Sequence, residues 1–409
     1  VKFVVRPQRK DLFSATFGVF LLPNRRPSGA IRTTSLNRRL ARGSEDLTGA
    51  LCLTLEKIEM KKTLVAIAAL AVVGAASAQS SVTLYGRIDA SIGSQKTKVG
   101  GTTIADGGAL IRSGGHTGSR WGMKGSEDLG GGLKAIFQLE QGFNVDDGTA
   151  SAAARQFHRQ AYAGLSGGFG SLTVGRQYDP IDNMYGAHDA FGYSGYGAMN
   201  YVFNSNCATL GLPAGSQGPG DCIGRQNNSV FYATPDMGGF SAGVMWAPGE
   251  NKVPGVVSAG KMWGLQAGYM NGPINIGGAW QRNELTGNSI AVKNWEFGGS
   301  YDLAVAKLFL QFEGSKIGGA TNAKDTGFQI GAVIPLGAPS LMVSYARENQ
   351  KAGGAKYAEA TGFSLMAQYP LSKRTYVYAA YLRGEVDPTA AGVGTTQQRN
   401  FGLGLVHNF

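Results

Sequence analysis

The chain has 409 residues, and its 38 Lys and Arg exceed its 27 Asp and Glu by a net charge of +11. Its 63 glycines are about twice the usual share of roughly 7%, yet 43% of residues are apolar and no Gly-X-Y period occurs, which excludes collagen and simple disorder. The only long apolar run, residues 64–76, has 13 residues, and a membrane-spanning helix needs about 20. Helical membrane proteins are therefore excluded.

Residues 60–78 have the layout of a secretory signal peptide. A short basic start is followed by an apolar centre at 64–73 and by a small-x-small end at Ala76 and Ala78. We therefore predict cleavage after Ala78, in preference to a buried apolar helix. Because a signal peptide should begin a chain, we interpret residues 1–59 as a mis-assigned upstream extension. A basic regulatory or targeting extension is the alternative.

Removing residues 1–78 changes the charge and the cysteine content. That part holds 13 basic and 5 acidic residues, so residues 79–409 keep 25 against 22, a net charge of +3. The apparent basicity disappears, and we expect no nucleic-acid partner. Only Cys207 and Cys222 remain, and two cysteines in an exported chain suggest one disulfide. Two buried free thiols are less favoured, because both cysteines lie in a stretch rich in Gly, Pro and Asn.

From residue 79 onward, apolar and polar residues alternate with a period of two. In the first segment Val82 and Leu84 share one face, while Arg87 and Asp89 lie on the other. The same alternation recurs at 294–301, 308–313, 363–369 and 401–409. This pattern predicts β-strands with one apolar and one polar face.

Short breaks and long connections alternate between these segments. The short breaks, rich in Gly, Pro, Asp and Asn, are 126–132, 167–170, 235–239, 271–273, 303–306, 336–339 and 370–374. The long connections are 96–115, 145–156, 180–226, 248–261, 284–293, 315–324, 348–359 and 386–398. They separate 16 predicted strands.

An even number of strands with short turns at one end and long loops at the other predicts an all-β, antiparallel, 16-stranded transmembrane barrel spanning residues 79–409. Closure of the barrel satisfies every backbone hydrogen-bonding group in lipid. A soluble β-sandwich is the alternative, but its connections would not sort so regularly into short and long sets.

Several motifs follow one another along residues 79–409. They are Ser81-Val82-Thr83-Leu84-Tyr85-Gly86, Ser119-Arg120-Trp121-Gly122, Arg159-Gln160-Ala161-Tyr162, Gly175-Arg176-Gln177-Tyr178 and the terminal Phe409. In their joint order they resemble the Gram-negative general porins, and most of all the betaproteobacterial type. The resemblance covers essentially the whole predicted mature chain.

This resemblance implies a fold, a location and partners. It implies a homotrimer in the outer membrane, each barrel with a water-filled channel for passive diffusion of small hydrophilic solutes and inorganic ions. The implied partners include outer-membrane lipid, lipopolysaccharide and the barrel assembly machinery, for which Phe409 is similar to an assembly signal. No cofactor or metal is implied.

The resemblance also implies that a third external loop folds inward and narrows the pore. The third long connection, 180–226, is by far the longest, and a disulfide between Cys207 and Cys222 would hold its tip region rigid. Family pores place arginines on the wall opposite acidic groups of this loop. The residues that match this pore constriction are Arg120, Arg159, Arg176, Arg225, Asp182 and Asp189. Because the arginines outnumber the acidic groups, we expect weak anion selectivity.

The alternation supports the arginines unequally. Arg120 has the parity of the polar face, opposite to Trp121. Arg176 shares its parity with Leu172 and Val174, so its inward direction rests on the resemblance or on a bulge near the strand end, and Arg159 has the same ambiguity. For each arginine the alternative is a solvated charge at the barrel rim.

Three other functional classes fit the sequence less well than a general porin. We expect no enzyme activity, because the histidines at 116, 158, 188 and 407 accompany no Gly-x-Ser-x-Gly elbow and no clustered metal spacing. An adhesion barrel without a conducting pore would not need a long third loop. A substrate-specific porin is the main alternative. In such a porin the aromatic residues of the third long connection would form the surface that binds the solute, and these are Tyr185, Phe191, Tyr193, Tyr196 and Tyr201.

Overall fold

The computed structural model describes residues 80–152, 155–202, 224–249, 261–284, 291–318, 322–390 and 392–409. The strands are β1 (Ser81–Val99), β2 (Thr102–Asp106), β3 (Leu110–Ser113), β4 (Arg120–Gly130), β5 (Leu133–Gly142), β6 (Gln160–Gly167), β7 (Gly170–Tyr178), β8 (Arg225–Ala233), β9 (Phe240–Pro248), β10 (Lys261–Asn271), β11 (Ile274–Glu284), β12 (Ala291–Asp302), β13 (Lys307–Ile317), β14 (Ala323–Pro335), β15 (Ser340–Ala352), β16 (Ala355–Pro370), β17 (Thr375–Pro388) and β18 (Thr396–Asn408). A short helix, α2 (Pro180–Tyr185), follows β7. No helix of the described part is long and apolar enough to cross a membrane.

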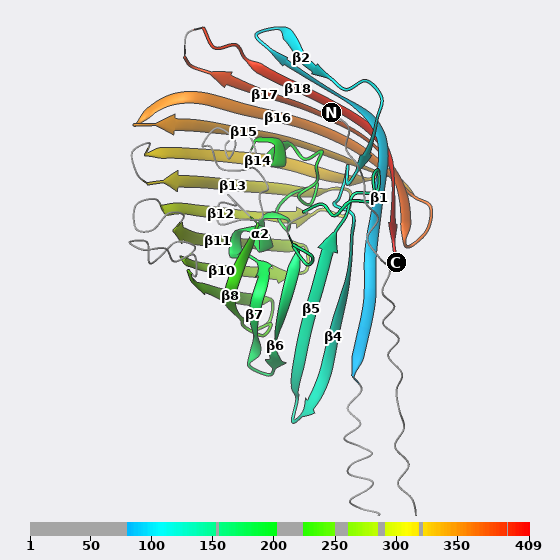
Figure 1. Cartoon of the computed structure of the whole chain (residues 1–409), viewed down its shortest axis with the longest axis vertical. Coiled ribbons are helices and arrows are strands. Elements are labelled where there is room, and N and C mark those ends of the chain that lie inside the picture. Colours follow the sequence, from blue (N-terminus) through cyan, green and yellow to red (C-terminus); the bar gives the residue numbers. More distant parts are fainter. Residues whose placement is uncertain are drawn as a thin grey trace, which may run out of the picture. The chain divides into compact units, whose positions relative to one another are not determined.

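The strands form one closed antiparallel sheet. Neighbours follow the chain order, and β1 pairs with β18 on one side and with β4 on the other (Figure 1). The short strands β2 and β3 pair with β1 beyond the stretch that pairs with β4, so β2, β3 and β4 share one place in the ring. The 18 strands of the described residues therefore occupy 16 positions, which confirms the predicted 16-stranded barrel.

The two faces of the sheet differ in chemistry, as the alternation predicts. Val82 and Leu84 are 67% and 62% exposed on the outer face, where apolar side chains of the other strands also gather. On the opposite face, Gln281, Gln311 and Gln329 are fully buried. An apolar exterior and a polar interior are the distribution that a barrel in lipid requires, because the bilayer core offers no hydrogen-bond partners.

Two of the long loops expected from the sequence are instead β-structure. The ladder of β1 continues to Val99 and returns through β2, within the expected loop 96–115. Likewise β15 and β16 remain paired up to a turn at Gly353 and Gly354, where both φ angles are positive, so the expected loop 348–359 is wrong. In both places the strands have polar residues on both faces, and this hides them from a search for alternating hydrophobicity.

A bulge interrupts β7 near its end, at Arg176, as one of the two interpretations of that arginine expected. The pairing of β7 with β8 shifts register between Gly175 and Gln177, and Gly175 has a φ of 137°. Leu172 and Val174 stay on the exposed outer face, whereas Arg176 becomes buried. The expected bulge is therefore confirmed, and it turns Arg176 away from the lipid-facing side.

Candidate functional site

Arginines from neighbouring strands form a row on the inner face of the barrel. Arg87 lies on β1, Arg120 begins β4, Arg159 directly precedes β6 and Arg225 begins β8. Arg87 and Arg120 are direct cross-strand partners. Both donate a hydrogen bond to the hydroxyl of Thr117, at 3.2 Å and 3.3 Å respectively. This arginine row, defined as Arg87, Arg120, Arg159 and Arg225, gathers four positive charges on one part of the inner wall.

Glu140 on β5 lies between two members of the row. Its carboxylate accepts a hydrogen bond from Arg159 Nε at 2.6 Å and lies 3.6 Å from Arg120 Nε. The hydroxyl of Tyr85 donates a third contact to it at 3.0 Å. These charge-assisted contacts hold the two guanidinium groups in fixed positions. Because one carboxylate pairs with two guanidinium groups, the arginine row keeps a net positive charge.

Tyr178, the last residue of β7, links the other end of the row. Its hydroxyl accepts hydrogen bonds from Arg159 Nη2 at 2.9 Å and from Arg225 Nη2 at 2.7 Å. The guanidinium carbon of Arg225 also lies 4.2 Å from the centre of the Tyr178 ring, a cation–π contact. Tyr178 adds no charge of its own, so it orders the arginines without neutralising them.

Arg176 has a different environment from the row. Its Nε donates to the backbone carbonyl of His158, and its Nη1 donates to Asn227 Oδ1 at 2.6 Å. Its side chain is buried, so it makes these contacts away from bulk water. Arg176 therefore ties the chain before β6 to the start of β8, the two segments that carry Arg159 and Arg225.

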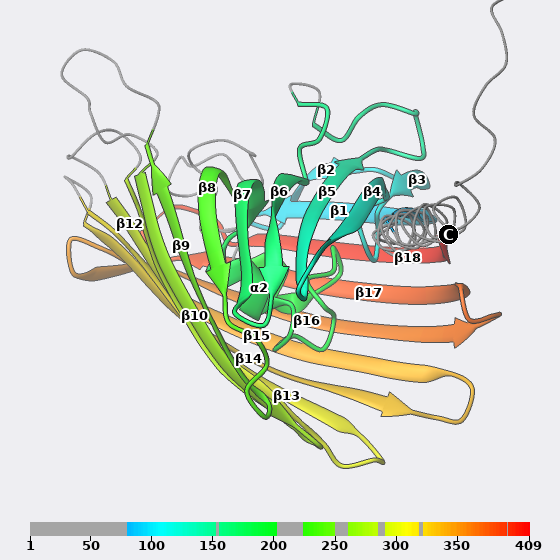
Figure 2. The same cartoon turned by 90° about the horizontal axis from the view of Figure 1, so that it is seen from below.

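The described part of the β7–β8 connection, residues 179–202, is called here the β7–β8 segment. It begins with Asp179, which caps α2 by accepting a hydrogen bond from the Asp182 amide at 2.8 Å. The other carboxylate oxygen of Asp179 accepts from Gln281 Nε2 on β11 at 3.0 Å. Burial raises the pKa of Asp179. The helix α2 is thereby fixed to the polar inner face of the barrel, and Figure 2 shows it among the strands.

The later part of the β7–β8 segment contacts β12 and β14. The carboxylate of Asp189 accepts hydrogen bonds from the backbone amides of Phe191 and Tyr193, both at 3.0 Å, and from Gln329 Nε2 at 2.8 Å. Burial raises its pKa. His188 Nδ1 lies 2.6 Å from a carboxylate oxygen of Glu296. Asp189 therefore organises the segment and attaches it to the wall, and among the described residues it forms no ion pair with an arginine.

The aromatic residues of the β7–β8 segment pack against the wall. Tyr185, Phe191 and Tyr196 are at most 2% exposed. Tyr201 lies so close to Gly384 on β17 that an added Cβ there would approach its ring to 2.1 Å. Tyr185, Phe191 and Tyr196 therefore lack the exposed faces that an aromatic ladder for sugars needs, whereas Tyr193 and Tyr201 are half-buried.

Asp182 is the acidic residue of the segment that faces the arginine row. It is half-buried on α2, and the loss of solvation raises the pKa of its carboxyl group to about 7. Arg225 and Arg159 oppose that rise by favouring the charged form, while the nearby Asp179 adds to it. Asp182 thus lies within electrostatic reach of the row from the opposite side.

One serine–histidine pair could suggest hydrolase chemistry. Ser151 Oγ lies 3.1 Å from His158 Nε2. The other ring nitrogen of His158 is buried and has no hydrogen-bond partner among the described residues, so the pair lacks the orienting group of a triad. Burial and three nearby arginines lower the pKa of His158 to about 4. In the same described part, no group of three or more His, Cys, Asp or Glu side chains is placed to hold a metal ion.

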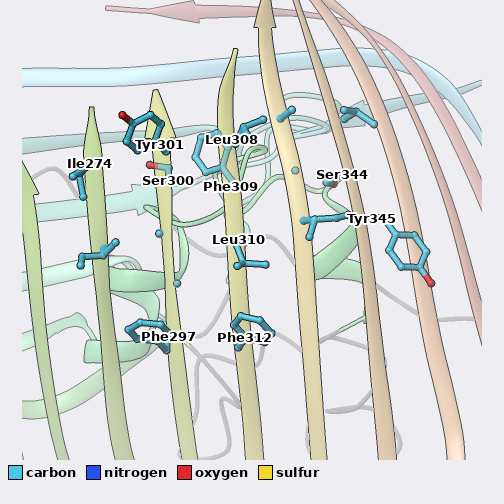
Figure 3. Close-up of a pocket in the computed structure, with 17 residues that line it drawn as sticks. Ile274, Phe297, Ser300, Tyr301, Leu308, Phe309, Leu310, Phe312, Ser344 and Tyr345 are labelled. Atoms are coloured by element: carbon cyan, nitrogen blue, oxygen red, sulfur yellow. The ribbon is translucent and has the colours of Figure 1, made fainter. Parts of the chain in front are cut away.

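An apolar groove lies on the outer side of β11–β15 (Figure 3). Its walls are formed by exposed apolar side chains, among them Ile274, Phe297, Tyr301, Leu308, Leu310 and Phe312. These residues have the parity of the lipid-facing surface. The groove therefore belongs to the membrane-exposed belt and offers nothing to a hydrophilic solute.

Comparison with known proteins decides the family. The family described as Gram-negative porin matches residues 63–389. The chain belongs to the Gram-negative porin family. The porin fold, the outer-membrane location and channel function that its sequence predicts are confirmed.

Relatives of this porin cover most of its length. An outer membrane porin protein of Bordetella pertussis is 33% identical over 395 residues, covering 82% of this chain and 99% of that protein. Outer membrane porin protein 32 of Delftia acidovorans is 37% identical over 285 residues, covering 68% of this chain and 77% of that protein. The solved structure of an anion-selective porin from Comamonas acidovorans has a TM-score of 0.67 and 30% identity, covering 81% of this chain and all of that one.

The structure adds members to the site that the sequence predicted. Arg87, Glu140 and Tyr178 join Arg120, Arg159 and Arg225. Arg87 could have been found from its parity on the polar face of the first strand, whereas nothing local to Tyr178 showed that it contacts two arginines. Cys207 and Cys222 lie outside the described residues.

Proposed function

We propose that this porin is a general diffusion channel with a weak preference for anions, and that the arginine row forms one wall of its constriction. Arg120, Arg159 and Arg225 are the principal residues, and Arg87 extends the wall onto β1. Asp182 supplies the opposing charge from the β7–β8 segment, which narrows the channel. The single observation that carries this proposal is the row of four arginines linked through Thr117 and Tyr178, with one carboxylate, Glu140, between two of them.

Placement matters more than net charge. Exposed charges are screened beyond about 8–10 Å at physiological salt, so a net charge of +3 spread over residues 79–409 selects ions poorly. Charges gathered in a narrow passage act at shorter range and govern which ions pass. The arginine row therefore favours anions, and Asp182 across the passage creates a transverse field that orients dipolar solutes.

The remaining predicted constriction residues have a supporting part in this proposal. Arg176 holds the base of the arginine row, and Asp189 holds the β7–β8 segment on the wall. A disulfide between Cys207 and Cys222 would stiffen the same connection. We also propose a homotrimer, as the family resemblance implies; solved structures with the same fold include a trimer form of OmpT of Vibrio cholerae.

The test is single-channel recording of the purified porin in planar bilayers. We expect stable conductance and, in a potassium chloride gradient, a reversal potential of the sign produced by anion preference. A cation preference contradicts the proposed role of the arginine row, and an absence of conductance favours the adhesion barrel. Block of the current by one sugar, phosphate or organic acid at low concentration favours the substrate-specific alternative.

A further inference from the structure

A hollow of about 260 Å³ lies on the inner face of the barrel, and it is called here the Lys124 hollow. Its lining comes from β1, β4, β5 and β6, which lie side by side in Figure 1. Direct cross-strand partners form two rows of this lining, Thr83–Lys124–Gln138–Tyr162 and Ser81–Ser126–Ile136. On β1 and β5 these residues have the parity of Arg87 and Glu140, so they face the lumen.

The Lys124 hollow lies on the periplasmic side of the arginine row. On β4, Arg120, Gly122 and Lys124 share one face, and at about 3.4 Å per residue the Cα atoms of Arg120 and Lys124 are about 14 Å apart. Beyond Lys124 the strand ends in a short turn at Gly131 and Gly132, and short turns of outer-membrane barrels are periplasmic. A separation of about 14 Å exceeds the screening length of about 8–10 Å at physiological salt. Lys124 is therefore an electrostatic site of its own.

A chain of hydrogen bonds joins the hollow to the arginine row. The hydroxyl of Tyr162 donates to Gln138 Oε1 at 2.8 Å, and Gln138 Nε2 donates to the hydroxyl of Tyr85 at 2.6 Å. Tyr85 donates in turn to Glu140, the carboxylate that pairs with two arginines of the row. Because each of these groups has a partner, the orientation of the Gln138 amide and of both tyrosine hydroxyls is fixed. This wall of the hollow is thus ordered before any solute arrives.

Lys124 gives the hollow an exposed positive charge. Among the described residues Lys124 forms no ion pair. Its ammonium nitrogen lies 5.5 Å from the centre of the Tyr85 ring, and a cation–π contact of this kind leaves the charge in place. Glu140 is engaged by two members of the arginine row, and Asp128, further along β4, has Lys134 as its cross-strand partner. The charge of Lys124 therefore remains available to a solute.

The lining beside Lys124 combines hydroxyl groups with one aliphatic side chain. Ser81, Thr83 and Ser126 bring hydroxyls, which can both donate and accept hydrogen bonds, and Ile136 brings an apolar surface. The volume is below the range of about 300–1,000 Å³ that is usual for sites of drug-sized ligands, so it suits a smaller molecule. A solute that uses the whole lining has one negative group, several hydroxyl groups and a short carbon skeleton.

We propose that the Lys124 hollow is a second solute subsite, which holds small anions that carry hydroxyl groups, such as sugar acids and sugar phosphates. Lys124 binds the carboxylate or phosphate, and the hydroxyls of Ser81, Thr83 and Ser126 bind the hydroxyl groups of the solute. Lysine suits both kinds of anion, because its ammonium group is a point charge without the fixed geometry of a guanidinium group. The inference rests on the proposed diffusion channel and names a class of solute that this channel favours.

Binding in the Lys124 hollow has to be weak. A solute must leave a channel as well as enter it, so a subsite assists passage only when it releases the solute readily. We expect dissociation constants of about 1–10 mM, which correspond to a modest free energy of binding. Such a subsite concentrates hydroxylated anions at the periplasmic exit without making the porin substrate-specific.

The experiment measures how solutes block the single-channel current in planar bilayers. Gluconate, glycerol phosphate, glucose and acetate are added on the periplasmic side, and the current noise gives a dissociation constant for each. Lys124→Gln removes the charge of the hollow, and Thr83→Val removes one hydroxyl at nearly constant shape. Lys134→Gln is the matched control, because Lys134 lies further along the same face of β5 and does not line the hollow.

We expect the unaltered porin to bind gluconate and glycerol phosphate at least about threefold more tightly than glucose or acetate, since only the first two use both parts of the lining. Lys124→Gln should weaken gluconate binding about threefold to fivefold. Thr83→Val should weaken gluconate binding and leave acetate binding unchanged, and Lys134→Gln should match the unaltered porin. Equal constants for gluconate and acetate in the unaltered porin, or equal losses in the two lysine variants, overturn the subsite.

The reversal potential in a potassium chloride gradient separates this inference from the proposed function. Lys124→Gln should keep the reversal potential of the unaltered porin, whereas Arg120→Ala should shift it. The proposed function fails if the unaltered porin prefers cations or does not conduct. The subsite fails if the anion preference is intact and the gluconate constant is the same with and without Lys124.

Discussion

Arg87 stands directly opposite Arg120 across the β1–β4 ladder, and the two guanidinium groups share the hydroxyl of Thr117. Two like charges in this position repel, and a hydroxyl can order them without removing charge. Arg87 is further fixed by a hydrogen bond from its Nε to Asn408 Oδ1 at 2.6 Å. The arginine row therefore extends onto β1, beyond Arg120, Arg159 and Arg225.

Neutralising Arg87 should weaken the anion preference. We expect the anion-to-cation permeability ratio to fall by about twofold in Arg87→Gln, since one charge in a water-filled passage is worth less than about 1 kcal/mol. Arg87→Lys keeps the charge and should retain most of the ratio. Reversal potentials in a salt gradient measure both. If Arg87→Lys loses as much as Arg87→Gln, the side chain acts through its hydrogen bonds and not through its charge.

Arg120 should have a larger effect than Arg87. It occupies the centre of the row, between Arg87 and Arg159, and it faces the carboxylate of Glu140. Removing it by Arg120→Ala leaves Glu140 with a single arginine, so the local positive potential falls further. The matched control is Lys351→Ala, which removes a charge from the outer face of β15. No shift in reversal potential with Arg120→Ala, or an equal shift with Lys351→Ala, would refute the mechanism.

The selectivity should also depend on pH near neutrality. The pKa of Asp182 is raised to about 7, so its carboxyl group is mostly neutral at pH 6 and mostly ionised at pH 8. Ionisation places a negative charge opposite the arginine row, so anion preference should decrease as the pH rises. The pKa values of His116 and His158 are lowered to about 4 by burial first and by nearby arginines second, so neither titrates in this range.

The variant Asp182→Asn separates this carboxyl group from other sources of pH dependence. It should show at pH 8 the stronger anion preference that the unaltered porin has at pH 6. Reversal potentials recorded at both pH values test this. A pH dependence that persists in the variant assigns the titration to another group.

The sequence predicted the barrel well because lipid imposes a simple rule on each strand. Residues such as Val82 and Leu84 must be apolar on the outside, so the alternation could be read from one chain. That rule ends where the strands leave the membrane, and there the continuation of β15 to Ala352 was missed. Contacts between the β7–β8 segment and the barrel wall, such as that of Asp189 with Gln329, also follow no pattern that a local stretch of sequence shows.

The site illustrates the same limit. The parity of Arg120 predicted its direction, and the parity of Arg176 pointed outward, so that a bulge was one of two ways for it to face inward; the structure has this bulge. The sequence predicted Asp189 as an acidic residue of the pore constriction. In the structure its carboxylate accepts hydrogen bonds from backbone amides of its own segment and from Gln329. Such partners come from residues distant in sequence, and a single sequence does not reveal them.

The start of the mature chain is a separate prediction. The signal-peptide layout of residues 60–78 places the first mature residue at Gln79, and β1 begins two residues later at Ser81. N-terminal sequencing of the porin from purified outer membranes should therefore begin at Gln79. Recovery of any peptide from residues 1–59 in that material contradicts the prediction.

The last prediction concerns Phe409 and barrel assembly. Its backbone exchanges two hydrogen bonds with Gly86 of β1, at 3.0 Å and 3.1 Å, and an added Cβ on Gly86 would lie 2.2 Å from its ring. Phe409 thus adds one residue pair, Gly86 with Phe409, to the ladder between β1 and β18, and its ring covers Gly86. Deleting it should lower the amount of inserted trimer far more than Leu405→Ala, which removes apolar surface from the same face of β18. Equal losses indicate that Phe409 contributes apolar burial alone.

A third variant distinguishes two roles of Phe409. The residue can act as an assembly signal in the unfolded chain, or it can stabilise the pairing of β1 with β18 in the folded barrel. Gly86→Ala keeps the terminal aromatic residue but forces its ring off β1, because the new Cβ would overlap it. If Phe409 acts as a signal in the unfolded chain, Gly86→Ala should insert as fast as the unaltered porin and unfold at a lower temperature. The rate of appearance of heat-modifiable barrel on gels measures insertion, and the temperature at which that form is lost measures the stability of the β1–β18 pairing. Slow insertion of Gly86→Ala would mean that packing of the ring on β1, and not recognition of Phe409, limits assembly.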